Sequence, residues 1–316
     1  MKLLLWLILI AAVAATATLW KAARHERLAE ATWPPEGAFL TVDGHRVHYV
    51  VRGEGPDLVL IHGASGNTRD YTHAMAGRLA GRYRVFVFDR PGLGYTDRID
   101  PDGASLAAQA GLLAGAAAEL GAERPIVYGH SYGGAVALAW ALHRPESLSA
   151  LVVSAAASNP WDTGLGTYYT ILSHPLGQRV VIPFLTAWVP DRVVDAQIDA
   201  VFAPQTAPPG YHRHIGAGLT LRRVSMRANA LHRRNLLAEI EAQAPRYGEI
   251  AVPVEILHGD ADTTVPLAVH SEPLSRQIPG SRLTVLEGVG HMLHHAAPEA
   301  ADAAIDRAAA RAGLLP

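Results

Sequence analysis

The chain has 316 residues, nearly half of them apolar, which is enough for one large α/β domain with an insertion or for two modest domains. Its formal net charge is −2, so nothing in the composition points to a nucleic-acid partner. The chain contains no cysteine, which excludes disulfides, thiolate zinc sites and cysteine nucleophiles.

The N-terminus is the most apolar part of the chain. Residues 3–20 carry no charge, and as a helix they are about 27 Å long, just enough for the hydrocarbon core of a bilayer. We therefore expect residues 1–21 to be a single-pass transmembrane anchor that places the protein in a membrane. The alternative is a signal peptide cleaved at the small residues 15–17, which would leave a secreted or periplasmic protein.

Residues 22–37 are expected to form a linker, because Pro34, Pro35 and Gly37 break any helix. An α/β pattern follows, and Asp43-Gly44 indicates a hairpin turn at its start. Strands are predicted at residues 39–42, 45–52, 57–61, 84–88, 126–128, 148–153, 252–257 and 282–286. Helices are predicted at residues 69–80, 104–120, 132–143, 266–278 and 296–312.

Alternating strands and helices predict an α/β fold with a mostly parallel, eight-stranded sheet and helices on both faces. The core would comprise residues 38–154 and 249–316. Between them, residues 155–248 show no clear strand and are predicted to form a helical cap. Six aromatic residues of this segment are candidates for an apolar pocket or for packing onto the core: Trp161, Tyr168, Tyr169, Phe184, Trp188 and Phe202.

The cap also carries a basic stretch. Its six arginines are Arg213, Arg222, Arg223, Arg227, Arg233 and Arg234. A solvated helix face is the default interpretation of such a stretch. Contact with anionic lipid headgroups or an acidic substrate is the alternative.

The strongest local motif is Gly-His-Ser-Tyr-Gly at residues 129–133, between a predicted strand and a predicted helix. This is the context that a G-x-S-x-G elbow requires, because a sharp turn exposes the serine hydroxyl and the flanking positions must lack bulk. Ser131 is therefore the candidate nucleophile.

A serine hydroxyl needs a base, and the chain offers 16 histidines. His291 follows the last predicted strand in a glycine-containing loop, and we favour it over His294 and His295 at the start of the next helix. The base in turn needs a carboxylate. Asp262 and Asp260 compete for that role after the strand at 252–257, and we favour Asp262 because it lies further out on the loop.

The oxyanion that forms during acyl transfer needs hydrogen-bond donors. Small residues in the loop at 62–67, which follows the strand at 57–61, allow a substrate to approach the backbone closely. The predicted donors are the backbone N–H groups of Ala64 and Tyr132. Ser131, Asp262 and His291 each follow a different strand, so all should meet at one edge of the sheet.

In these motifs the chain resembles the α/β-hydrolase superfamily, in the branch with a cap inserted after the sixth strand. The resemblance covers residues 38–312. It includes the stretch Asp-Arg-Pro-Gly-Leu-Gly-Tyr-Thr at 89–96, in which Thr96 replaces the family's serine. The family's usual spacing from the loop glycine selects Asp262 as the acid, and its usual oxyanion donor corresponds to Ala64.

The resemblance implies a carboxylesterase-like serine hydrolase acting on a small-molecule ester or acyl substrate, expected to be apolar, with no cofactor and no metal. Serine at position 131 argues against haloalkane dehalogenases and epoxide hydrolases, which carry aspartate there. A carbon–carbon bond hydrolase or a cofactor-free haloperoxidase on the same triad is the alternative. A non-catalytic binding protein on a hydrolase scaffold is a more distant one.

Overall fold

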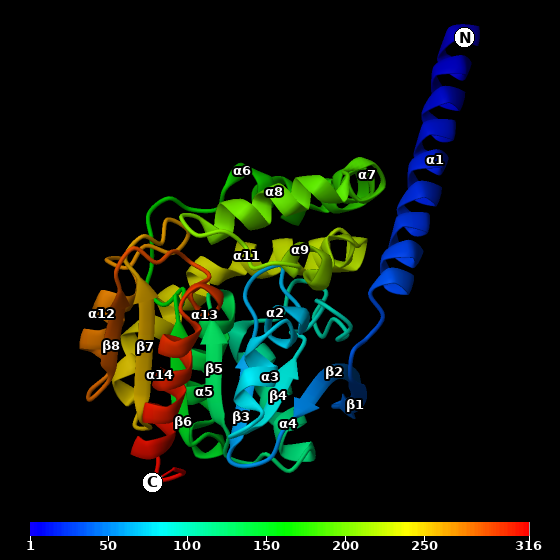
Figure 1. Ribbon diagram of the computed structural model, residues 1–316. Helices are drawn as coiled ribbons and strands as arrows, with labels where there is room; N and C mark the ends of the chain where they lie inside the picture. Colours follow the sequence, from blue (N-terminus) through cyan, green and yellow to red (C-terminus); the bar gives the residue numbers. More distant parts are fainter. Residues whose placement is uncertain (316) are drawn as a thin grey trace.

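The computed structural model describes residues 1–315, and its centre is one eight-stranded sheet with the order β1-β2-β4-β3-β5-β6-β7-β8 (Figure 1). β1 pairs with β2 and β2 with β4 in antiparallel fashion, and the other neighbours are parallel. The strands are β1 (Ala38–Val42), β2 (His45–Arg52), β3 (Asp57–Ile61), β4 (Arg84–Phe88), β5 (Ile126–His130), β6 (Ala150–Ser154), β7 (Val254–Gly259) and β8 (Arg282–Leu286). The predicted sheet is thereby confirmed.

Helices cover both faces of the sheet, as predicted. One face is packed by α4 (Leu106–Glu119), α5 (Tyr132–His143) and α12 (Ser271–Gln277), with a 3-10 turn at Pro145–Ser147 after α5. The other face is packed by α2 (Arg69–Thr72), α3 (Met75–Leu79), α13 (Leu293–Ala296) and α14 (Pro298–Arg311).

Two of these helices differ from the sequence prediction. The helix expected at residues 69–80 is split into α2 and α3, because Ala74 leaves the helical conformation with φ at −149°. The helix expected at residues 266–278 begins only at Ser271.

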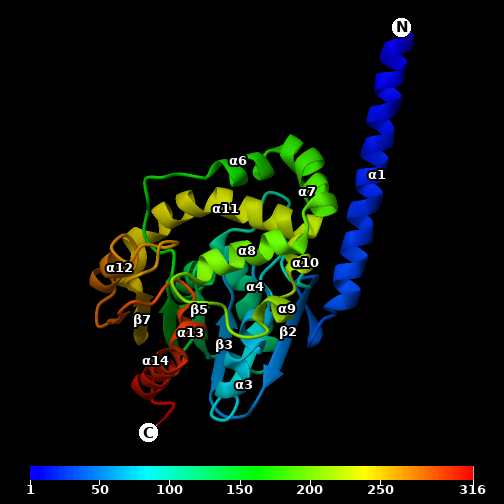
Figure 2. The ribbon, with the colours of Figure 1, turned by 45° about the horizontal axis from the view of Figure 1, so that its top comes forward.

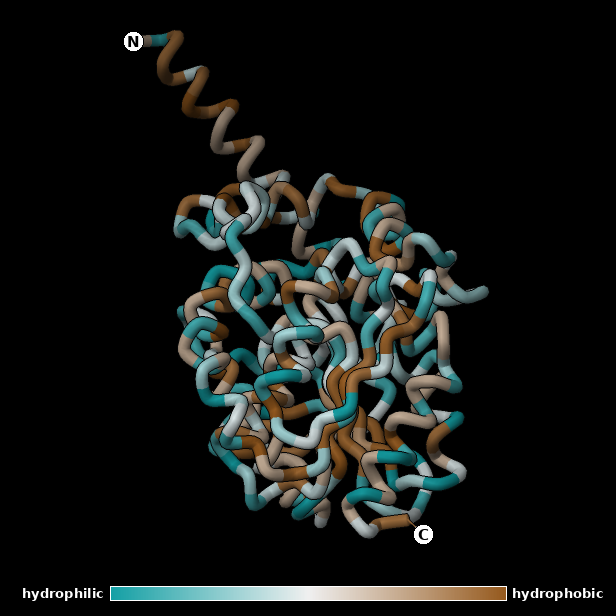
Figure 3. Tube along the Cα trace, turned by 90° about the vertical axis from the view of Figure 1, so that its left-hand side faces the viewer, coloured by the Kyte–Doolittle hydropathy of each residue, from teal (hydrophilic) through white to brown (hydrophobic). Residues whose placement is uncertain are grey.

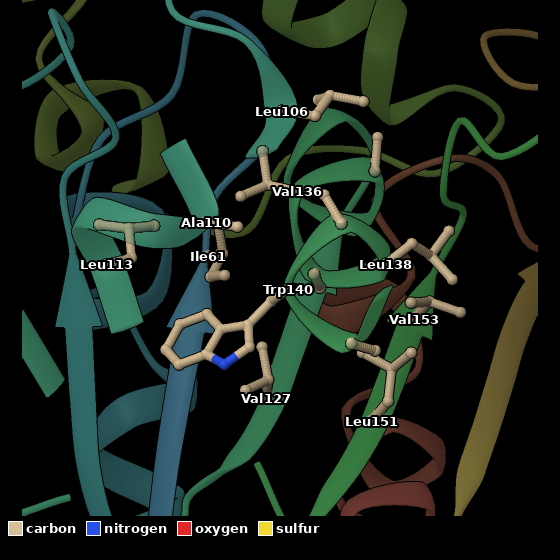
Figure 4. Packing of buried hydrophobic residues seen from close by; sticks show 14 of the residues in the cluster. Ile61, Leu106, Ala110, Leu113, Val127, Val136, Leu138, Trp140, Leu151 and Val153 are labelled. Carbon is tan, nitrogen blue, oxygen red and sulfur yellow. The ribbon is translucent and has the colours of Figure 1, made fainter. Parts of the chain in front are cut away.

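The central strands are fully buried and consist mainly of Val, Ile, Leu and aromatic residues, as is typical of parallel strands covered on both faces. α5 packs directly on them (Figure 4). Its Trp140 is completely buried in one cluster with Val127 and Leu151, and its indole N–H donates to Ser147 Oγ at 2.8 Å. This packing fixes the position of α5, whose N-terminus follows Ser131.

Residues 155–248, which we call the cap, run between β6 and β7. The cap contains α6 (Thr167–Ser173), a π-helical segment (Gly177–Val181), α7 (Ile182–Trp188), α8 (Asp191–Phe202), α9 (Tyr211–Ile215), α10 (Ala217–Thr220), α11 (Arg223–Gln243) and a 3-10 segment (Ala244–Glu249). It lies over the end of the sheet toward which the parallel strands point (Figures 1 and 2).

α1 is a single helix from Lys2 to Thr32, so most of the expected linker is helical. It is long and apolar enough to cross a membrane. Its second half packs against the cap, and Ala22 and Ala29 are buried there. The helix continues past residue 21 because this contact stabilises it, and it ends at Thr32, before Trp33 and the following prolines.

Candidate active site

Ser131 lies at the sharp turn between β5 and α5. Its φ of 54° and ψ of −119° are a backbone conformation that side-chain-bearing residues rarely adopt. Two neighbours hold the turn: the Ser131 N–H donates to the Ser154 carbonyl at 2.9 Å, and the Gly134 N–H donates to the Ser131 carbonyl at 3.0 Å. The strained conformation predicted for the elbow is present.

The two glycines of the motif are required by close packing. A Cβ on Gly129 would lie 2.3 Å from the Gly133 carbonyl oxygen, and a Cβ on Gly133 would lie 2.1 Å from the Ile61 carbonyl oxygen. Neither separation is sterically possible, so only glycine lets the elbow approach β3 this closely.

His291 and Asp262 form a buried pair. His291 Nδ1 lies 2.7 Å from Asp262 Oδ2, and both side chains are buried. Asp262 Oδ1 accepts the backbone N–H groups of Thr264 and Val265 at 2.8 and 2.9 Å. The carboxylate is thus held by one oxygen and contacts the imidazole with the other, an arrangement that fixes the ring's tautomer.

Asp262 is built to remain ionised. Burial alone would raise the pKa of its carboxyl. Hydrogen bonds from His258 and His291, with the charge of His291 and the Val265 amide, outweigh burial and hold this pKa well below its ordinary value. The pair therefore has the electrostatics of a carboxylate that stabilises an imidazolium.

The competing residues have other partners. Asp260 is exposed, and its Oδ1 accepts the Gly288 N–H at 2.7 Å, so it ties two loops together. His294 and His295 both direct Nε2 toward Asp70 Oδ1, at 3.3 and 2.9 Å. Asp260, His294 and His295 therefore have partners other than Ser131, Asp262 and His291.

Ser131 and His291 line the same cavity of about 810 Å³, between the strand ends and the cap. Gly63 and Ala64 contribute to the same wall. Tyr132 is buried just behind Ser131. Within residues 1–315, the backbone N–H groups of Ala64 and Tyr132 have no hydrogen-bond acceptor, which leaves them available to a bound oxygen.

The loop that carries Ala64 is held from below by Arg90, a residue whose role the sequence analysis did not identify. Arg90 is fully buried, and its guanidinium donates at 2.8–2.9 Å to the carbonyls of His62 and Gly63 and to Gln109 Oε1. It also lies 4.2 Å from the centre of the Tyr132 ring. Burial lowers the pKa of Arg90 to about 10, so it stays charged at neutral pH.

The cap holds the same loop from above. Ser65 has a positive φ of 56°, and its N–H donates to Asn229 Oδ1 of α11 at 2.9 Å. The signal for Arg90 was its place beside the glycine-rich turn after β4, whereas nothing local marks Asn229, 164 residues away in sequence. The loop is thus clamped between core and cap.

The cap supplies most of the apolar wall of the cavity. Of the aromatic candidates, Tyr168, Tyr169 and Phe202 line it. Phe184 and Trp188 instead point outward and are about half exposed, and Trp161 packs against the core. The wall suits an apolar ligand segment.

One group of side chains has donor atoms close enough for a metal ion: Asp70, His294 and His295, all within 4.8 Å of one another. Tyr211 also donates to Asp70 Oδ1 at 2.8 Å, so that one oxygen already has three hydrogen-bond partners. We interpret the group as a hydrogen-bonded cluster that joins α2, α9 and α13.

Comparison with known proteins identifies the family. Residues 58–304 match the family model described as the alpha/beta hydrolase family. An uncharacterised protein of Mycobacterium tuberculosis is 28% identical over 280 residues, covering 84% of this chain and 78% of that protein.

Solved structures share the fold. An esterase from Thermogutta terrifontis is 21% identical with a TM-score of 0.68, covering 87% of this chain and 99% of its own. A membrane phospholipase A, described as a bacterial virulence factor, is 23% identical with a TM-score of 0.65, covering 97% of this chain and 98% of its own. The family model covers well over half of the sequence, and the chain therefore belongs to the alpha/beta hydrolase family.

Proposed function

We propose that the protein is a serine hydrolase that cleaves carboxylic esters through an acyl-enzyme intermediate. One observation carries the proposal. Ser131 sits at a strained elbow on the wall of a cavity, and the same wall contains His291, whose far ring nitrogen is paired with buried Asp262. A nucleophile, a base and an orienting carboxylate are the parts that acyl transfer needs.

In the first step His291 Nε2 takes the Ser131 hydroxyl proton as Oγ attacks the ester carbonyl carbon. The tetrahedral oxyanion is stabilised by the N–H groups of Ala64 and Tyr132. The C–O bond to the alcohol then breaks, and His291 returns the proton to the leaving oxygen. Water attacks the acyl-enzyme by the same route, releasing the acid and restoring Ser131.

The cavity indicates the substrate class. Its walls are mainly apolar and come from the cap, with Leu172, Leu185 and Val189 among the lining residues. An acyl chain gains roughly 0.8 kcal/mol for each methylene group that it buries. We therefore propose esters of medium or long apolar acids rather than charged substrates.

The test is labelling with a fluorophosphonate, which reacts only with an activated serine. Wild-type protein should be labelled and should hydrolyse p-nitrophenyl esters, with a preference for longer acyl chains. Ser131→Ala should abolish both the labelling and the ester hydrolysis. Ser65→Ala, at another serine on the cavity wall, should still be labelled. Equal labelling of Ser131→Ala and wild type would refute the assignment.

We further propose that α1 remains attached as a membrane anchor. Beyond its apolar first half, the helix is bonded to the cap through Glu26, which receives three hydrogen bonds from Arg223 at 2.6–2.9 Å. The apolar segment and this docked part belong to one unbroken helix, Lys2–Thr32, which supports an anchor held at a fixed position on the cap. The intact mass of protein extracted from membranes tests this: residues 1–17 should be retained, and their loss would contradict the anchor.

A further inference from the structure

The outer face of the cap is unusually apolar for a surface. Six large side chains on α6, on the π-helical segment and the residue before it, and on α7 are each 45–64% exposed, and we call them the cap patch: Tyr168, Ile171, Leu176, Val180, Phe184 and Trp188. The Phe184 and Trp188 rings are 6.5 Å apart. Apolar side chains gathered in this way on a solvent-exposed face usually mark an interaction surface.

The cap patch lies beside the apolar half of α1. Trp188 Nε1 donates to Thr18 Oγ1 at 3.3 Å, and the Lys21 ammonium lies 3.6 Å from the centre of the Trp188 ring. Thr18 belongs to the uncharged segment, whereas Lys21 begins the charged part of α1. Trp188 is therefore level with the end of the apolar segment, where a tryptophan favours the membrane–water interface.

The docking of α1 on the cap keeps the two surfaces together. Arg222, which is 4% exposed, pairs with Glu30 at 3.0 Å, and Arg223 pairs with Glu26 at 2.6 Å. The default interpretation of these two arginines as a solvated helix face is thus wrong, because they bind α1. Figure 3 shows apolar cap segments at the end of the molecule from which α1 emerges.

Two of these helices, α6 and α7, also contribute to the cavity wall, together with α8. Tyr168 on α6 and Val193 on α8 are both about half exposed and also line the cavity. Leu172 and Leu185, on the inner faces of α6 and α7, line it too. Tyr168 therefore belongs both to the cap patch and to the wall of the cavity that contains Ser131, so the two apolar surfaces meet at this residue.

We propose that the cap patch is seated in the interface of the bilayer that α1 crosses, and that the cavity takes a long-chain acyl ester laterally from that bilayer. This inference rests on the proposed function for its substrate and on the anchor for its orientation. The occupant of the cap patch is thus lipid rather than a second copy of the chain, because the patch continues directly from the apolar half of α1.

The first test measures where the cap patch lies and needs no activity. The chain has no cysteine, so Val180→Cys and Val285→Cys each provide a single site for an environment-sensitive fluorophore in full-length protein in nanodiscs. Val285 is the matched control: it is 46% exposed, outside the cap patch, on the edge strand β8 on the opposite side of the molecule from α1 (Figure 1).

We expect doxyl-labelled lipids to quench the probe at position 180 several-fold more than the probe at position 285, and aqueous iodide to do the reverse. Equal iodide quenching at the two positions would overturn the proposal. A probe at position 180 that is shielded from both quenchers would also overturn it, because a protein partner would then cover the cap patch.

The second test distinguishes the entry of a bilayer ester into the cavity from the hydrolysis step itself. Val180→Asp and Phe184→Asp lie outside the cavity lining, so both should hydrolyse a water-soluble short-chain ester within twofold of wild type. Hydrolysis of a long-chain ester embedded in vesicles should fall at least tenfold, whereas Val285→Asp should leave both rates unchanged.

Unchanged hydrolysis of the embedded ester by both cap variants would refute lateral access. Wild-type protein that hydrolyses neither ester would instead refute the proposed function, and the quenching experiment would still decide where the cap patch lies.

Discussion

Asp262 uses its two oxygens for different purposes. Oδ1 is anchored by two backbone amides of its own loop, and Oδ2 is left to face His291. His258 Nε2, 3.3 Å from Oδ2, adds a second imidazole to the same oxygen. Because the loop fixes the carboxylate, the ring of His291 has one favoured orientation and one favoured tautomer.

Asp262→Asn should preserve the fold but reverse the hydrogen bond to His291 and so favour the wrong tautomer. We expect kcat for a soluble ester to fall about 10⁴-fold. Asp260→Asn, the matched control in the same loop, should cost less than tenfold because Asp260 contacts only the Gly288 amide. Steady-state kinetics decide between them, and similar losses in the two variants would contradict the assignment of the acid.

At the scale of elements, the loop between β3 and α2 is fixed from two sides. Its carbonyls at His62 and Gly63 are held by the guanidinium of Arg90, and its Ser65 amide is held by Asn229 on α11. This clamp fixes the proposed oxyanion donor, the Ala64 N–H, so that it would not have to rearrange during the proposed reaction, which is the condition for strong electrostatic stabilisation.

Arg90→Lys keeps the charge but loses the fork that reaches two carbonyls and Gln109. We expect kcat to fall about tenfold with KM nearly unchanged, because the displaced amide acts mainly on the transition state. Arg84→Lys, at the other end of β4 and paired with Asp57, is the control and should leave kcat unchanged. A lower Tm with an unchanged kcat in Arg90→Lys would reduce Arg90 to a purely structural role.

The sequence predicted those elements whose signals are local. Apolar runs located all eight strands to within two residues or so, and the elbow needed only its glycines and its position after a strand. The interruption at Ala74 and the late start of α12 were missed because tertiary contacts, rather than local propensity, decide them.

Contacts between residues far apart in the chain could not be predicted from the sequence. The pairs that join α1 to the cap link residues 192 and 197 positions apart, and no local pattern announces them. The same holds for the clamp on the loop at Ser65. What the residues alone supported was the order of Ser131, Asp262 and His291 after three strands, and their roles remain predictions for the experiments above.

At the scale of the whole molecule, the interior contains several histidines that are held neutral. Burial lowers the pKa of His62 and His294 to about 4 and that of His232 to about 3. For His62 the hydrogen bonds agree: Nε2 accepts the Arg90 N–H at 3.0 Å, and Nδ1 donates to the Gly63 carbonyl at 2.9 Å. A second proton on this ring would break the first of these bonds.

These lowered pKa values make the protein sensitive to mild acid. Below pH 6.5 the unfolded chain takes up protons that the folded chain refuses down to about pH 4, so the free energy of unfolding falls as pH falls through that window. Each such histidine contributes about 1.4 kcal/mol per pH unit there. We expect Tm to drop by roughly 5 °C or more between pH 7.5 and pH 5, and a constant Tm would show that these rings are not held neutral.

Because α1 is one unbroken helix from residue 2 to residue 32, it rigidly connects the α/β domain to the proposed membrane segment. One alanine inserted after Trp20 would rotate the domain by about 100° around the helix axis, relative to the membrane segment, and shift it by about 1.5 Å along that axis. A lipid bilayer is the same in every direction around its normal, so a protein that draws on lipid should tolerate the turn. A protein that depended on a protein neighbour in a fixed direction within the membrane would lose that contact.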